Sequence, residues 1–97
     1  MLVDFTVVCR SNSTKGENNS FFLEEMTIDP SKVWKIEPNY KMKQNLLEGK
    51  LPKGLDKNHE FCTLFLDVAG GSTTMIVVGS KEAIRSKISP EKKILKG

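Results

Sequence analysis

The residue types with the clearest capacity for chemistry lie between two apolar runs, in the stretch LDVAGGSTTMIVV at positions 66–78. A carboxylate, two glycines and two hydroxyls follow one another closely there: Asp67, Gly70, Gly71, Ser72 and Thr73. Glycines let backbone N–H groups approach a phosphate, and a carboxylate beside them can hold a metal-bound water. This composition is typical of a loop that binds nucleotide phosphates.

The stretch resembles the phosphate-binding loop of the actin, heat-shock chaperone and sugar-kinase superfamily, where an acidic residue at a strand end precedes glycines and a hydroxyl. The resemblance implies that Asp67, the glycine pair, Ser72 and Thr73 take those roles, although Ala69 stands where the family prefers glycine. That superfamily encloses its nucleotide between two large domains, whereas 97 residues make a single domain. We therefore interpret the stretch as a β-hairpin.

The hairpin interpretation places Gly70 and Gly71 at a two-residue turn, because glycine readily adopts the positive φ of the primed hairpin turns. The expected pairs are Ala69 with Ser72 and Leu66 with Met75, and Phe65 then lies opposite Ile76. Side chains alternate between the faces of a strand, and both faces of this hairpin are mostly apolar. A hairpin with one face in water alternates apolar and polar residues, so this one needs cover on both sides.

The second apolar face suggests a contact with another molecule. Its candidate interface residues are Phe61, Phe65, Ile76 and Val78. We expect a small non-enzymatic interaction or regulatory module that self-associates or docks on another protein through this face. The same face could instead be covered within the chain, by a closed barrel or by the helix that follows.

Nucleic-acid binding is the alternative, because aromatic and basic residues are interleaved in the middle of the chain. Its candidate residues are Trp34, Lys35, Tyr40, Lys41 and Lys43. Small barrels bind single strands by stacking aromatic rings on bases while lysines contact phosphates. The net charge of +3 and the pI of about 8.9 are only mildly basic, and no RNA-binding signature accompanies the residues.

Periodicity predicts a small α+β domain. We expect strands over 2–9, 21–28, 32–37, 61–68 and 73–78, and a helix over 80–89 with Ser80 as its N-cap. Residues 39–50 fit either a helix or a loop. The predicted fold is a mostly antiparallel sheet, or a partly closed barrel, of about five strands with a short C-terminal helix. One domain over 1–90 and a basic tail over 91–97 complete this organisation.

The two cysteines and the single histidine do not form a recognisable catalytic or metal-binding set. Cys9 and Cys62 each fall in an apolar run, so we expect free thiols rather than a disulfide. His59 precedes Cys62 by three residues, but a structural zinc site needs four ligands. A single histidine gives no catalytic arrangement. We expect no enzyme activity, no metal and no small-molecule cofactor.

The sequence shows no secretory signal and no run of 18 apolar residues. We therefore expect a cytoplasmic protein with no membrane partner.

Overall fold

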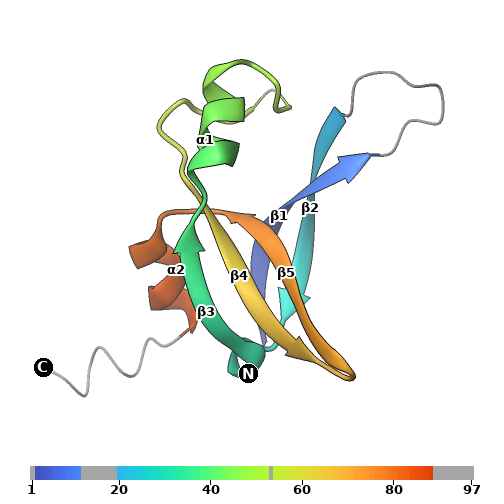
Figure 1. The fold of residues 1–97 in the computed structure, drawn as a ribbon. Helices are drawn as coiled ribbons and strands as arrows, with labels where there is room; N and C mark the ends of the chain where they lie inside the picture. The colour runs from blue at the N-terminus through green and yellow to red at the C-terminus, as the bar shows by residue number, and fades with distance from the viewer. Residues whose placement is uncertain (1, 12–19, 53, 89–97) are drawn as a thin grey trace, which may run out of the picture.

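A computed structural model describes residues 2–11, 20–52 and 54–88 (Figure 1). Within them five strands and three helical segments follow one another along the chain. Their bounds are β1 (Val3–Ser11), β2 (Ser20–Ile28), the 3-10 turn η1 (Pro30–Lys32), β3 (Val33–Pro38), α1 (Tyr40–Leu47), β4 (Phe61–Val68), β5 (Gly71–Val78) and α2 (Lys81–Ile88). The predicted strands are confirmed, and the predicted helix corresponds to α2.

The strands form one antiparallel sheet in the order β2-β1-β5-β4-β3, which is open and has β2 and β3 at its edges. Residues 29–32 connect these two edges. Four strand spacings in a flat sheet span about 19 Å, more than five residue steps at about 3.3 Å can reach. The sheet therefore curls strongly, as Figure 1 shows, without closing into the barrel that was one of the two predicted forms.

The curled sheet buries side chains on both faces, in two separate clusters. We call the face packed against α2 the inner face, and the opposite face the outer face. The inner cluster consists of Phe5, Val7, Ile28, Cys62, Leu64, Leu66, Val77 and Ile84. The outer cluster consists of Val8, Met42 and Phe61, with partly buried residues around them.

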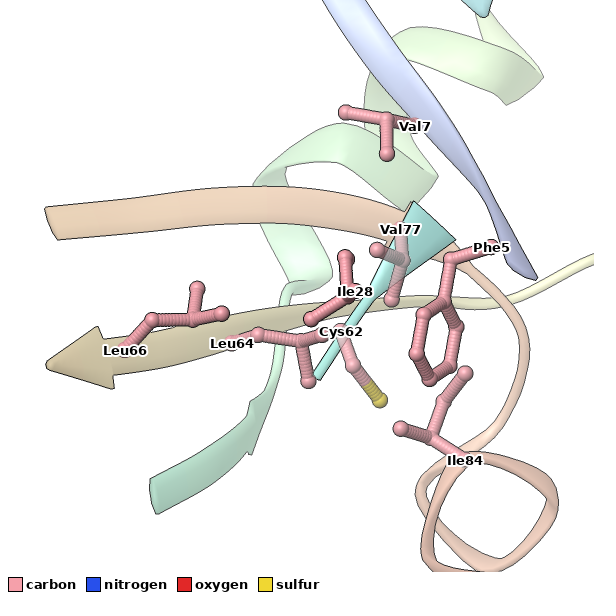
Figure 2. Packing of buried hydrophobic residues seen from close by; sticks show 8 residues of the cluster. All are labelled: Phe5, Val7, Ile28, Cys62, Leu64, Leu66, Val77 and Ile84. Carbon is pink, nitrogen blue, oxygen red and sulfur yellow. The ribbon is translucent and has the colours of Figure 1, made fainter. Parts of the chain in front are cut away.

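The inner cluster is the main core, and α2 covers it. Figure 2 shows Ile84 of α2 beside the ring of Phe5, with Cys62 and Val77 close by. Gly79 turns the chain from β5 into α2 with φ 142°, and a Cβ at this position would lie 2.9 Å from Cδ1 of Ile84. Glycine therefore permits both the turn and the close approach of the helix. The Ser80 hydroxyl accepts a hydrogen bond from the Ala83 N–H at 3.2 Å, as its predicted capping role requires.

The ambiguous segment 39–50 contains the helix α1. The Asn39 side chain accepts a hydrogen bond from the Met42 N–H at 2.8 Å, and its Nδ2 donates to the Thr63 hydroxyl at 3.0 Å. Asn39 therefore caps the helix and also fixes it to β4. Met42, which is 5% exposed, packs in the outer cluster with Phe61. The helix thus covers one end of the outer face.

The hairpin β4–β5 forms as expected, but its predicted pairing is wrong by two residues. Val68 pairs with Gly71 and Leu66 with Thr73, so the turn consists of Ala69 and Gly70. Both glycines have a positive φ, 89° at Gly70 in the second turn position and 154° at Gly71 where β5 begins. Because side chains alternate, a shift of two leaves every residue on its predicted face. Phe65 consequently lies opposite Thr74 rather than Ile76.

Candidate aromatic interaction surface

An irregularity in β3 brings two consecutive side chains to one place on the outer face. The pairing of β3 with β4 shifts between Val33, which lies opposite Leu66, and Lys35, which lies opposite Phe65. One extra residue, Trp34, therefore occupies the strand at this point, as in a β-bulge. The bulge keeps Val33 and Ile36 packed on the inner cluster although they are three residues apart.

Trp34 and Lys35 both contact the ring of Phe65. The Trp34 and Phe65 ring centroids lie 5.4 Å apart with an interplanar angle of 52°, a common geometry for aromatic pairs. The Lys35 Nζ lies 5.1 Å from the Phe65 centroid, within the range of a cation–π contact. We call Trp34, Lys35 and Phe65 the aromatic patch. Trp34 remains 56% exposed in it, while Phe65 is half-buried.

The charges around the aromatic patch are balanced. Lys35 Nζ lies 3.0 Å from a carboxylate oxygen of Glu37, and both side chains are about half exposed. Asp67 lies on the outer face two residues beyond Phe65, and it is exposed. Thr63 and Thr74 flank Phe65 on the same face. The patch is thus an aromatic centre with neutral hydroxyls and charges of both signs around it.

The other predicted interface residues are covered to different extents. Phe61 is 2% exposed and belongs to the outer cluster, so it is a core residue and not part of a free surface. Val78 and Ile76 are half-buried and pack against the same cluster. The predicted need for cover on this face is therefore met within the chain at the α1 end, whereas Phe65 lies toward the other end.

The candidate nucleic-acid residues do not gather at one place. Tyr40 is 77% exposed, but it follows Pro38, where β3 ends about 13 Å from Trp34 at about 3.3 Å per residue. Lys43 Nζ donates hydrogen bonds of 2.6 Å to the carbonyls of Lys57 and His59, so this cation holds a loop. Lys41 is exposed on α1. Of this set, Lys35 alone lies in the patch with Trp34.

The two cysteines and His59 lie in environments that suit a structural role. Both cysteines are free; burial raises the pKa of each thiol, with Glu24 adding to the effect at Cys9 and Glu60 at Cys62. Both are therefore protonated at neutral pH and weak nucleophiles. The His59 Nδ1 accepts a hydrogen bond from the Asp56 N–H at 2.9 Å. Within the described residues, no three His, Cys, Asp or Glu side chains gather as a metal site would require.

From the sequence, Trp34 was predicted to bind nucleic acid and Phe65 to lie in a protein interface. Their contact was not predicted. The available signal was the spacing of Val33 and Ile36, which breaks the alternation of a regular strand.

No family model, curated protein or solved structure matches this chain. The helices of the described part of the chain are all too short or too polar to cross a membrane.

Proposed function

We propose that this protein is a non-enzymatic interaction module that pairs with a second copy of itself through the aromatic patch. The observation that carries the proposal is Trp34, which is 56% exposed yet positioned against Phe65. A tryptophan that is already positioned loses little conformational freedom on binding and contributes large contact area. Such residues are the most frequent energetic centres of protein interfaces.

The local charge favours a protein surface over a nucleic acid. Nucleic-acid binding depends on cations that neutralise phosphates, and it needs a surplus of positive charge at the site. Here Glu37 pairs with Lys35, and Asp67 lies two residues from Phe65. A phosphate backbone that approached the patch would meet carboxylates as well as lysines.

The same distribution of charge favours a second copy as the partner. In a twofold dimer both copies use the same surface. A contact from one residue to a second residue of the other copy therefore occurs twice, once in each direction, so the surface must be complementary to itself. Lys35 lies on β3 beside Phe65, and Asp67 lies further along β4. If the twofold axis passes through the centre of the aromatic patch, Asp67 of one copy can approach Lys35 of the other. By symmetry, Lys35 of the first copy then approaches Asp67 of the second.

The size of the surface predicts weak association. Three strands about 4.8 Å apart and about six residues long give a flat area of roughly 300 Å² per copy. Stable interfaces bury about 800 Å² per partner. We therefore expect a dimer that forms at high protein concentration and dissociates on dilution.

The test is the molar mass measured by light scattering across a wide range of protein concentration, with the 260/280 nm absorbance ratio recorded. We expect Trp34→Glu to weaken dimerisation by at least about thirtyfold, corresponding to about 2 kcal/mol. The matched control is Tyr40→Glu, which introduces the same charge at a more exposed aromatic residue outside the patch. This control should dimerise like the wild type.

A wild-type protein that stays monomeric at the highest concentration would overturn self-association. Equal dimerisation of Trp34→Glu and the wild type would remove the patch from the interface. A peak that carries nucleic acid, loses it at high salt and loses it in Trp34→Glu would replace this proposal with nucleic-acid binding.

A further inference from the structure

A second binding feature lies at the opposite edge of the sheet, in β2. All nine residues of β2 pair with β1 without a bulge, and no strand of the described residues pairs with its other side. β1 in turn pairs with β5 only at Val7 and Val8, and Figure 1 shows the outer end of the β1–β2 hairpin projecting away from β5. The outward N–H and C=O groups of β2 therefore form a long, regular template for one more strand.

The side chains of β2 do not protect this edge. Proline, lysine and bulges commonly keep an exposed edge from pairing, and the segment Ser20–Ile28 contains no proline, lysine or arginine. Phe22 is 44% exposed on the strand and offers an apolar contact to a neighbour. When a strand is added to a sheet, main-chain hydrogen bonds give affinity and side chains at alternate positions give specificity. The side chains of β2 therefore determine which strand fits.

The charge of this edge is opposite in sign to that of the whole chain. Residues 20–29 contain the carboxylates of Glu24, Glu25 and Asp29 and no basic residue, whereas the chain has a net charge of +3. Glu24 and Glu25 are exposed, and neither forms an ion pair in the described part of the chain. Glu24 accepts a hydrogen bond from the Cys9 thiol at 3.9 Å, a weak donor that leaves the negative charge uncompensated. Because Glu24 and Glu25 are consecutive in a strand, an added strand meets one carboxylate on each face.

These charges disfavour a second copy as the added strand. Antiparallel pairing of the whole of β2 with β2 of another copy places Glu24 directly opposite Glu24, because this residue is the centre of the strand. Like charges directly opposite one another are destabilising, whereas opposite charges at the same place stabilise the pair of strands. We propose that the free edge of β2 binds an extended, basic segment of another protein as an added strand. This proposal does not depend on dimerisation through the aromatic patch.

The experiment uses a synthetic peptide as the probe. It has nine residues, the length of β2, with two consecutive lysines at its centre and alternating threonine and valine on both sides. The peptide is titrated into the isotope-labelled full-length protein, and NMR gives the dissociation constant and the hydrogen exchange of each β2 amide. The β2 amides that do not face β1 should become protected on binding, while those that face β1 report that the sheet is intact. A peptide with glutamates in place of the two lysines should bind at least about tenfold more weakly.

Reversing the charges of the protein gives the sharper result. Glu24→Lys/Glu25→Lys should prefer the glutamate peptide to the lysine peptide. Glu48→Lys/Glu60→Lys makes the same change of charge at two exposed residues elsewhere and should keep the preference of the wild type. Trp34→Glu should also bind the lysine peptide like the wild type, so failure of the aromatic patch and failure of this proposal are distinguishable.

Three results would overturn the proposal. The first is absence of binding at millimolar concentrations of the lysine peptide. The second is equal binding of a lysine peptide that is N-methylated at alternate residues, because charge attraction without main-chain hydrogen bonds would then be sufficient. The third is protection of the outward β2 amides that grows with protein concentration in the absence of peptide, since a second copy would then occupy the edge.

Discussion

Leu64 and Phe65 are neighbours in β4, yet they lie in different environments. Leu64 faces inward and is 0% exposed under α2, whereas Phe65 faces outward and remains half-buried against Trp34. Both are large apolar residues, so side-chain type does not explain the difference. The position of the helices does: α2 lies over the inner cluster, and α1 covers only the Phe61 end of the outer face. Cover by a second element turns an apolar sheet face into core.

The largest expected effect compares these two neighbours directly. Leu64→Ala should lower the free energy of unfolding by about 3 kcal/mol, because it leaves a cavity in a fully packed cluster. Phe65→Ala should lower it by about 1 kcal/mol, because it loses a partly exposed aromatic pair. Urea denaturation at neutral pH measures both. Equal losses would mean that the patch is as much a part of the core as the inner cluster.

A smaller effect distinguishes the two helices by their caps. Asn39→Ala should cost about 1–2 kcal/mol, because Asn39 caps α1 and also bonds Thr63 on β4. Ser80→Ala should cost about 0.5–1 kcal/mol, because the Ser80 hydroxyl makes one longer bond to Ala83. Thermal or urea unfolding gives both values. A larger loss for Ser80→Ala would show that α2, rather than α1, depends on its cap for its position.

The smallest effect concerns Asp29, which starts the turn that joins the two sheet edges. Hydrogen bonds from the Ser31 hydroxyl at 2.8 Å and the Ser31 N–H at 3.0 Å lower the pKa of this carboxyl from its ordinary 3.8. A lowered folded-state pKa adds stability that is present above the unfolded pKa and lost as the pH falls through the folded pKa.

The matching variant is Asp29→Ala. It should therefore be less stable than the wild type at about pH 6, and the difference should shrink as the pH falls below about 3.8. Urea titrations at the two ends of this range measure the change. A difference that does not depend on pH would show that the turn does not use the charged carboxylate.

Sequence periodicity was sufficient for the strands and for α2, because local alternation and a cap specify each of them. The order of the strands depends on contacts between distant segments, such as Val7 with Val77, and no local pattern encodes it. The predicted register of β4 and β5 was wrong because a turn at Ala69-Gly70 and a turn at Gly70-Gly71 place the same side chains on the same faces, so alternation does not distinguish them.

The candidate site was predicted only in its parts. Phe65 was named because it lies on the second apolar face of the hairpin, and Trp34 because lysines lie beside it in the sequence. Their contact depends on the bulge in β3, which adds one residue opposite Phe65. Phe61 was placed on a surface because alternation assigns a residue to a face but does not show what covers that face. The position of α1 supplies that information.

The bulge in β3 is needed for the aromatic patch on the surface but not for the inner core. Without one of the two residues between Val33 and Ile36, the strand would alternate regularly, and both apolar residues would still face inward. The inner core therefore does not need the extra residue. The aromatic patch therefore depends on a one-residue feature of β3 that can change while the residues of the inner cluster keep their places.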